Sequence, residues 1–291
     1  MILITGATGM LGSEICSLLR QQNKEVRAFT RSSSNENKLQ NLKNQGVHIF
    51  EGDLRKPDDL KKALNGIEAV ITTVSSMPFA YVPGKNDIET VDKNGVKNLV
   101  DIAKTVGVKH FVYTSFSKNI DADFPLRNAK REVEKHLKNS GINFTILRPG
   151  YFMEVWFSEA VGFDAVYGKV QICGEGAQPV SYISYKDVAK YAVKSLENSN
   201  AQNSVLEIGG PESVSQLDVV KLFESKHNQK FDVNHVPEEA LKQQIKTAQD
   251  QMQKSFFGLM YCLAKGDKIP MEENNRQFGI ELTSVKDFIS G

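Results

Sequence analysis

The chain has 291 residues, of which 40% are hydrophobic and 24% are charged, and these proportions are ordinary for a soluble globular protein. Its formal net charge of +1 creates no global field that would draw it to nucleic acid or to a membrane surface. The three cysteines lie far apart and form neither a metal-binding spacing nor a disulfide framework, so we expect a reducing, cytoplasmic location. We expect no signal peptide, and no apolar run approaches the length of a membrane span.

Residues 2–12, with the sequence ILITGATGMLG, combine a short apolar strand, a glycine-rich turn and the start of a helix. Gly6 permits a tight turn, Gly9 lets backbone N–H groups approach a pyrophosphate, and Gly12 lets the helix pack close to the strand. The spacing is G-x-x-G-x-x-G rather than G-x-G-x-x-G. The stretch therefore predicts a dinucleotide-binding turn, and the alternative is an ordinary strand-to-helix turn.

The hydrophobic pattern of the first half predicts alternating strands and helices. After the first strand we expect helices at residues 10–22, near 38–42, and at 57–64, 87–106 and 127–139, and strands at residues 25–30, 47–50, 69–74, 111–115 and 144–147. This alternation predicts a parallel sheet that is covered by helices on both faces.

The pattern changes after residue 149, where a dense aromatic cluster occupies residues 151–157. Strands are expected at residues 180–183 and 205–208, a helix at 186–196, and mostly helix from residue 216 onward. We therefore predict a doubly wound α/β Rossmann domain over residues 1–150, to which residues 176–210 return. A smaller C-terminal α/β cap is predicted over residues 151–291.

The end of the second strand bears on the choice of cofactor. An NAD site usually has an acidic residue there that binds the ribose hydroxyls, whereas an NADP site has a cation. Here the strand ends Phe29-Thr30-Arg31-Ser32, without an acid. Arg31 can pair with a 2′-phosphate, which predicts that NADP(H) is preferred over NAD(H); the alternative is an ordinary surface arginine.

An aspartate follows the third strand, in the sequence Gly52-Asp53-Leu54. Its carboxylate can accept a hydrogen bond from the amino group of an adenine. The alternative is a turn aspartate that caps the next segment, because aspartates at such positions often bond to nearby backbone N–H groups.

Several of these motifs occur together in one order. They are the TGATGMLG turn, Arg31, Gly52-Asp53, Tyr113-Thr114-Ser115, the AKREVE stretch at residues 129–134 and the ILRPG stretch at residues 146–150. With them, the chain resembles the NmrA-like branch of the atypical short-chain dehydrogenases/reductases. The resemblance covers roughly residues 1–210, and residues 211–291 match only loosely. That branch includes quinone oxidoreductases, isoflavone-reductase-like enzymes and non-catalytic NADP sensors.

The chain departs from the wider superfamily at the usual Tyr-x-x-x-Lys helix, in which the tyrosine exchanges a proton. No tyrosine occurs between Phe116 and Gly150, and Leu126 stands four residues before Lys130. Two formal matches, at residues 81–85 and 182–186, do not lie on a helix at the expected place, and we treat both as chance.

Lys130 is the remaining catalytic candidate on that helix. Lys130, Val133 and Leu137 share one helical face, so Lys130 is expected to point inward toward the cofactor edge. The resemblance implies that this lysine lies beside the nicotinamide and binds the cofactor or polarises the substrate. The alternative is a solvated lysine on a basic helix that also carries Arg131, Lys135 and Lys138.

The resemblance also implies that Ser115, at the end of the fifth strand, binds the reacting carbonyl; the alternative is a cap of a helix or turn. Cofactor contacts are expected from Gly6, Thr8, Gly9, Met10, Leu11, Gly12, Arg31, Asp53, Leu54, Val74, Ser75 and Lys130. An apolar substrate pocket is expected from Phe79, Tyr151, Phe152 and Trp156, with core packing as the alternative. The five histidines show no ligand spacing, and no metal is expected.

The favoured function is NADPH-dependent reduction of a quinone or small carbonyl compound. One alternative is a non-catalytic NADP(H) sensor that presents a surface to a regulatory protein partner, which would need no proton donor. Another is a nucleoside-diphosphate-sugar epimerase, against which the missing Tyr-x-x-x-Lys helix argues. The expected ligand is small and apolar, with no direct nucleic acid contact and no membrane, and either a homodimer or a protein partner fits.

Overall fold

The protein was examined as a computed structural model that describes residues 1–78 and 80–291. Within them the chain forms two compact units. The first unit consists of Met1–Ser115, Asn128–Leu147 and Val188–Leu206. The second unit consists of Phe116–Arg127, Arg148–Asp187 and Glu207–Gly291. Each unit is therefore assembled from segments that are distant in the sequence.

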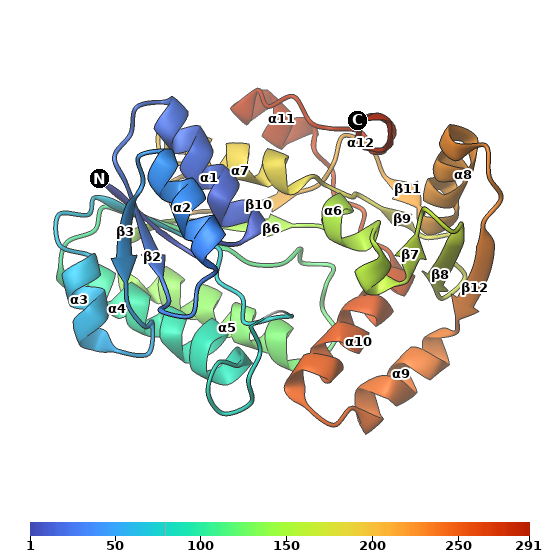
Figure 1. Cartoon of the computed structure of the whole chain (residues 1–291), viewed down its shortest axis with the longest axis horizontal. Helices are drawn as coiled ribbons and strands as arrows, with labels where there is room; N and C mark the ends of the chain where they lie inside the picture. The colour runs from blue at the N-terminus through green and yellow to red at the C-terminus, as the bar shows by residue number, and fades with distance from the viewer. Residues whose placement is uncertain (79) are drawn as a thin grey trace. The chain divides into compact units, whose positions relative to one another are not determined.

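The first unit is built on a seven-stranded sheet (Figure 1). The sheet and its helices follow one another as β1 (Ile2–Thr5), α1 (Met10–Gln21), β2 (Val26–Thr30), α2 (Glu36–Asn44), β3 (His48–Glu51), α3 (Pro57–Ala63), β4 (Ala69–Thr72), the π-helical segment η1 (Ile88–Gly95), α4 (Val96–Thr105), β5 (His110–Thr114), α5 (Pro125–Ser140), β6 (Asn143–Pro149), α7 (Tyr185–Lys194), the 3₁₀ turn η3 (Ser199–Ala201) and β10 (Ser204–Ile208).

The strand order is β10-β6-β5-β4-β1-β2-β3. β1 pairs in parallel with both β2 and β4, and the parallel pairing continues from β2 to β3, from β4 to β5 and from β5 to β6. The chain thus leaves β1 in one direction toward β3 and in the other toward β6. The carboxyl ends of β1 and β4 flank this switch point, where open α/β sheets bind their ligands. The predicted doubly wound Rossmann fold is confirmed.

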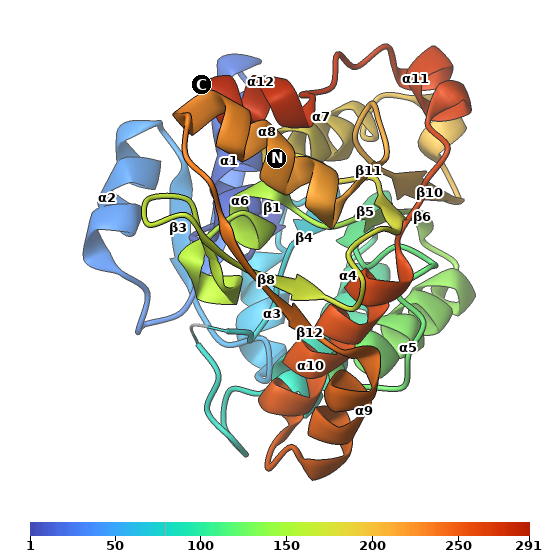
Figure 2. The same cartoon turned by 90° about the vertical axis from the view of Figure 1, so that its right-hand side faces the viewer.

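The strands at the centre of the sheet are buried because helices cover both faces of the sheet, whereas the edge strand β3 is partly exposed. All four residues of β1 and all four of β4 are buried. Figure 1 shows α1, α2 and α7 on one face of the sheet and α3, α4 and α5 on the other, and Figure 2 shows the same division after a quarter turn. α1 buries Leu11, Ile15 and Leu19 at helical spacing, so one stripe of the helix faces the sheet.

The second unit contains two small sheets and most of the remaining helices. Its elements are α6 (Met153–Trp156), the 3₁₀ turn η2 (Glu159–Val161), β7 (Phe163–Asp164), β8 (Lys169–Cys173), β9 (Pro179–Val180), β11 (Val214–Ser215), α8 (Gln216–His227), β12 (Asp232–Val236), α9 (Glu238–Thr247), α10 (Gln251–Lys265), α11 (Glu272–Phe278) and α12 (Val285–Ser290). β8 lies between β7 and β12, and β9 pairs with β11. The aromatic rings of Phe157, Phe163 and Phe223 contact one another in its interior in tilted and edge-on arrangements.

Three local predictions need correction. The expected strand at residues 180–183 shortens to β9, because the N–H groups of Ser181 and Ile183 donate to Asp267 and Tyr151 outside a regular ladder. β12 lies inside the stretch that was expected to be helical, and it pairs in parallel with β8, which was also missed. The first half of the long helix expected at residues 87–106 is the π-helical segment η1 rather than α-helix.

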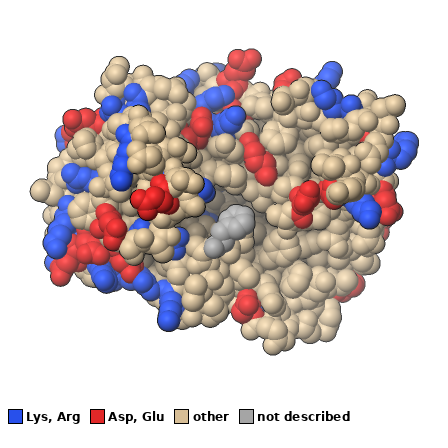
Figure 3. All heavy atoms as spheres, viewed as in Figure 1, with Lys and Arg blue, Asp and Glu red and all other residues tan. Residues whose placement is uncertain are grey.

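Charged side chains of both signs are interspersed on the face seen in Figure 3. This mixture is what a formal net charge of +1 leads one to expect. In the part of the chain that the structure describes, no helix is both long enough and apolar enough to cross a membrane.

A buried carboxylate joins several segments of the second unit. Asp267 Oδ1 accepts hydrogen bonds from Ser117 Oγ at 2.6 Å and from Asn119 Nδ2 at 2.8 Å. The other oxygen, Oδ2, is buried and has no hydrogen-bond partner among the described residues. Burial raises the pKa of Asp267 from 3.8 to about 6, although the bonds from Ser117 and Asn119 oppose the rise.

This environment predicts a pH-dependent contribution to stability. Burial raises the pKa of Asp267 in the folded protein to about 6, whereas the pKa in the unfolded chain is about 4. The contribution of Asp267 to the free energy of unfolding is therefore fully present below pH 4 and is lost as the pH rises through 6. Relative to wild type, Asp267→Asn should therefore gain free energy of unfolding between pH 4 and pH 7, by on the order of 3 kcal/mol. Urea unfolding of both proteins across this range measures the difference, and a constant difference would contradict the assignment.

Candidate functional site

The glycine turn after β1 brings the backbone of α1 unusually close to the end of the strand. Gly6 has a φ of +78°, which favours glycine, and its carbonyl accepts a hydrogen bond from Gly9 N at 3.0 Å. A Cβ at Gly12 would lie only 2.2 Å from Gly6 O. No side chain caps the start of α1, and its first turn carries no acid. The geometry thus leaves the helix N-terminus open to an anion.

Two cavities in the first unit share Arg31, Asp53 and Asn86, and the smaller one reaches the glycine turn at Thr8. The smaller, of about 80 Å³, is lined by residues that include Thr8, Arg31, Asp53, Leu54, Val74 and Ser75. The larger, of about 700 Å³, is lined by Arg31, Ser32, Ser33, Glu51, Gly52, Asp53, Arg55, Lys56, Asp59, Ala80, Tyr81, Val82, Lys85 and Asn86. Six of the twelve predicted cofactor contacts therefore line the smaller cavity, and their contact with a cofactor stays a prediction. Met10 is 44% exposed at the start of α1, and Leu11 is buried beneath it.

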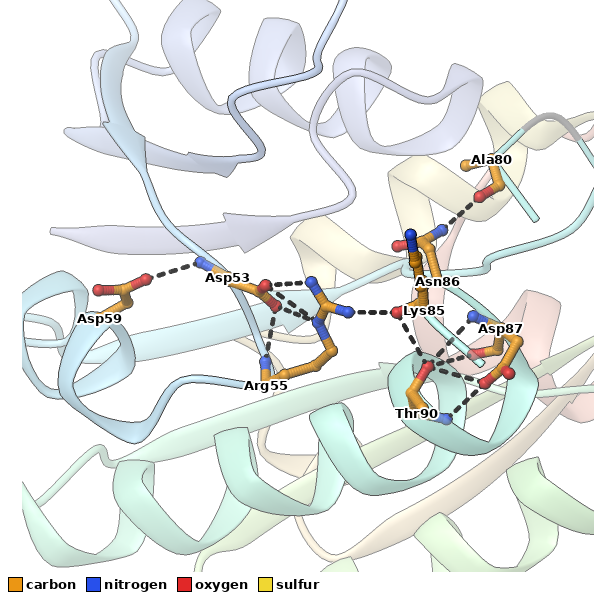
Figure 4. Close-up of polar contacts among 8 residues, drawn as sticks. All are labelled: Asp53, Arg55, Asp59, Ala80, Lys85, Asn86, Asp87 and Thr90. Carbon is orange, nitrogen blue, oxygen red and sulfur yellow. Dashed lines mark hydrogen bonds and ion pairs between the residues drawn. The ribbon is translucent and has the colours of Figure 1, made fainter. Parts of the chain in front are cut away.

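Arg31 and Asp53 lie in both cavities but differ in their partners. Arg31 is exposed, and its guanidinium has no hydrogen bond or ion pair among the residues that the structure describes. Both oxygens of Asp53, by contrast, accept hydrogen bonds from Arg55 (Figure 4). These bonds are the first cause that lowers the pKa of Asp53. The proposed contact of Asp53 with adenine stays a prediction, and Arg55 was missed in the sequence.

Lys130 on α5 is 5% exposed, at the carboxyl end of β5. Its Nζ donates to the backbone carbonyl of Thr114 at 3.0 Å and lies 5.4 Å from the centre of the Tyr113 ring. Burial lowers the pKa of Lys130, and the charges of Asp92 and Glu134 oppose that fall. Val133 and Leu137 are fully buried on the same helical face, as their spacing predicts. Lys130 is thus buried on the inward face of α5, and its place beside a cofactor and its chemical role stay predictions.

Asp92 on η1 supplies the buried counter-charge and was not predicted. It is 1% exposed, and its Oδ2 accepts a hydrogen bond from the backbone N–H of Ser76 at 3.0 Å. Burial raises the pKa of Asp92, and the charge of Lys130 opposes the rise more than any other group does. A signal existed in the sequence, since Asp92 shares the buried face of its helix with Ile88 and Val91. An acidic residue on the apolar, buried face of a helix needs a hydrogen-bond or ion-pair partner, because burial of an unpaired carboxylate is unfavourable.

Ser115 is buried, but its hydroxyl has a protein partner. Ser115 Oγ donates to Glu134 Oε1 at 2.5 Å, and Arg131 Nη1 donates to the same oxygen at 2.7 Å. A role for Ser115 in binding a carbonyl therefore stays a prediction, because that role would require the hydroxyl to change its partner.

Three further polar atoms in this region are buried without a partner among the described residues: Ser76 Oγ, Asp92 Oδ1 and Thr114 Oγ1. All three belong to the segments that meet around Lys130. Buried polar atoms are normally hydrogen-bonded, so a group of unpaired ones indicates a place where a polar ligand or water binds.

The predicted aromatic pocket residues belong to the second unit, apart from Phe79, which lies outside the described residues. Tyr151 is buried, donates its hydroxyl hydrogen to Leu259 O at 3.0 Å and packs edge-on against Trp156. Phe152 and Trp156 are half-buried, and Trp156 lines a small apolar cavity with Phe157 and Tyr182. A substrate role for these residues stays a prediction. Among residues 1–78 and 80–291, no group of three or more His, Cys, Asp or Glu side chains could hold a metal ion.

Several known proteins are similar to this chain in sequence or in fold. The model of the NmrA-like family matches residues 1–289. Photosystem II assembly factor Ycf39 of Trieres chinensis is 30% identical, over 81% of this chain and 72% of its own length. The NAD(P)H azoreductase of Xenophilus azovorans is 30% identical, over 75% of this chain and 71% of its own length. A solved NADPH-dependent quinone oxidoreductase of Escherichia coli, complexed with NADPH, superposes with a TM-score of 0.81 at 22% identity, over 100% of this chain and 99% of that one, and shares the fold.

Two substitutions in the glycine turn, at Gly12 and at Gly9, test its geometry as a matched pair. Gly12→Ala should lower the free energy of unfolding by about 1–3 kcal/mol or more, because its Cβ would lie 2.2 Å from a backbone oxygen that cannot rotate away. Gly9→Ala should change stability far less, because its backbone angles suit alanine and its Cβ would lie 3.3 Å from the same oxygen. Thermal unfolding of both variants tests the pair, and equal losses would contradict the geometry.

Proposed function

Because the chain belongs to the NmrA-like family, we propose that it binds NADP(H) and uses NADPH to reduce a quinone or another small carbonyl compound. The observation that carries this proposal is the buried Lys130, whose Nζ donates to Thr114 O, beside unpaired polar atoms in the unit that contains the glycine turn. The azoreductase and quinone oxidoreductase named above support the reaction type.

The residues present fit a dinucleotide. The turn between Gly6 and Gly12 excludes side chains where a pyrophosphate would approach α1, and the two cavities suit an adenosine end. When bound, the nicotinamide supplies the hydride chemistry. The exposed guanidinium of Arg31, at the end of β2 and without an acidic neighbour on that strand, supports a preference for NADP(H) over NAD(H).

Lys130 would bind the nicotinamide ribose or stabilise negative charge that develops on the substrate oxygen. Its Nζ has a fixed acceptor in Thr114 O, and Asp92 favours its charged form against the effect of burial. A donor that is held in place before reaction stabilises a developing oxyanion without reorganisation. A quinone suits such a site because its reduction can take protons from water, so a tyrosine donor is less necessary.

A second candidate is an NADP(H) sensor without turnover. Two observations favour it: Ser115 Oγ already donates to Glu134, and α5 carries Leu126 where the superfamily carries a tyrosine. The similar protein of Trieres chinensis is named as an assembly factor, and its name refers to no reaction. The epimerase alternative lacks comparable support, because Leu126 cannot exchange a proton.

Further aspects of the function rest on the same proposal. The nucleotide domain would comprise residues 1–150 with 176–210, and residues 151–291 would form the substrate cap, with Tyr151, Phe152 and Trp156 lining a pocket for a small apolar substrate. The three cysteines are buried and free, which suits a reducing, cytoplasmic location. A homodimer fits the enzyme, and a protein partner fits the sensor.

The cofactor preference has a direct test. Arg31→Ala should weaken NADPH binding roughly tenfold to a hundredfold and leave NADH binding nearly unchanged, because a guanidinium–phosphate pair contributes about 1.5–3 kcal/mol. Fluorescence titration of both cofactors measures the ratio. Equal affinities of the wild-type protein for NADPH and NADH would refute the preference.

The catalytic assignment is tested at Lys130. Lys130→Met keeps the buried stem but removes the charge, and we expect about a hundredfold slower NADPH oxidation with small quinones while NADPH still binds. Because the substitution leaves Asp92 without its counter-charge, the double variant Lys130→Met/Asp92→Asn keeps the test valid should the single variant unfold. Lys135→Met, at an exposed position on the same helix, is the control.

The two candidate functions give different outcomes in this assay. A wild-type protein that binds NADPH but oxidises it with no quinone or activated carbonyl is a sensor. Normal turnover by Lys130→Met would mean that the lysine has only a structural role.

A further inference from the structure

We propose that Arg55 determines selectivity for the 2′-phosphate by holding the carboxylate of Asp53 away from Arg31. This inference rests on the proposed binding of NADP(H). Arg31 and Arg55 line the same cavity. In this inference Arg31 binds the ligand, and Arg55 binds the carboxylate of Asp53.

The bonds of Arg55 are directed at the protein rather than at the cavity. Its Nε lies 2.9 Å from each carboxylate oxygen of Asp53, and its backbone N–H also donates to Asp53 Oδ1 at 2.9 Å. Its Nη2 pairs with Asp53 Oδ2, and its Nη1 donates to the backbone carbonyl of Lys85. Figure 4 shows this side chain lying between the connection after β3 and the turn that contains Lys85. Three of the five guanidinium N–H groups of Arg55 are thus directed at the protein, and two remain.

Asp53 lies close to Arg31 because of the pairing between β2 and β3. Thr30 is in register with Glu51, and Gly52 N donates to Thr30 O at 2.9 Å, so the two chains leave the sheet side by side. Arg31 and Asp53 then line both cavities. Asp53 is only 25% exposed at its side chain and is fixed further, since its N–H donates to Asp59 Oδ2.

An uncompensated Asp53 would act against a 2′-phosphate in two ways. It would repel the phosphate, and it would offer Arg31 an internal partner that competes with the ligand. By occupying both oxygens of Asp53, Arg55 removes this competition. Arg31, which has no ion pair among the described residues, is then available to the ligand.

Arg55 could instead matter only as a structural link. Its bond to Lys85 O attaches it to the turn at residues 80–86, where Asn86 also bonds to Ala80 O. A purely structural role predicts equal losses of affinity for nucleotides with and without the 2′-phosphate. Replacing Asp53 would not repair such losses, so the two roles can be separated.

The test measures the binding of 2′,5′-ADP and 5′-AMP by calorimetry to the full chain at low salt. Wild type should prefer 2′,5′-ADP. Arg55→Met should reduce this preference about threefold to tenfold, mainly by weakening 2′,5′-ADP binding. Arg55→Met/Asp53→Asn should restore the preference to within about twofold of wild type, because the competing charge is gone. Lys61→Met, which removes an exposed cation paired with Asp58 at 3.7 Å, is the control.

The outcomes separate this inference from the function on which it rests. If wild type does not prefer 2′,5′-ADP, the proposed NADP(H) preference is wrong, and this inference is wrong with it. If wild type prefers 2′,5′-ADP but Arg55→Met keeps the preference, or if Asp53→Asn fails to restore it, only the role of Arg55 is wrong. The readout is equilibrium binding of fragments, so turnover does not affect it.

Discussion

The burial of a lysine ammonium is the constraint on which the polar architecture of the first unit depends. A charge removed from water strongly disfavours folding unless it gains an acceptor and a counter-charge. For Lys130 these are Thr114 O at 3.0 Å and the carboxylate of Asp92. The lysine comes from α5, the carbonyl from β5 and the carboxylate from η1. Three elements that are separate in the sequence must therefore meet at the carboxyl end of the sheet before Lys130 can be buried with its charge.

One short segment connects this cluster to the two cavities that Arg31 and Asp53 line. Arg55 holds the carbonyl of Lys85, and Asp87 and Thr90 then form a reciprocal cap at the start of η1, which carries Asp92 two residues later. The π-helical geometry of η1 buries Asp92 on the same face as Val91. Such segments are frequent at functional sites, because an extra residue per turn alters which side chains face inward. Arg55 and the lysine cluster are thus connected through residues 85–92.

The sequence predicts the sheet because its strands are continuous apolar runs, and it predicts the orientation of Lys130 because Val133 and Leu137 mark the buried face of α5. Arg55 and Asp92 are harder to predict. Arg55 binds an acid only two residues away, but no local pattern shows that it also reaches Lys85 O, and the neighbours of Asp92 come together only when separate segments pack. β12 is missed for a related reason. Its residues alternate in exposure only weakly, and the strand is defined by a parallel partner about 60 residues earlier. The local sequence pattern of a strand does not show which distant strand pairs with it.

The fold alone does not separate turnover from sensing, because proteins named as reductases and as assembly factors are both similar to this chain. The chemistry around Lys130 is more informative. Ser115 donates its hydrogen to Glu134, so the described donor best placed to meet negative charge is the lysine. A cation alone is enough to stabilise a weakly basic oxyanion, such as the aryl oxide that forms when a quinone is reduced. A simple ketone yields a far more basic alkoxide that needs a proton at once. The donor set therefore supports quinone-type acceptors over simple ketones.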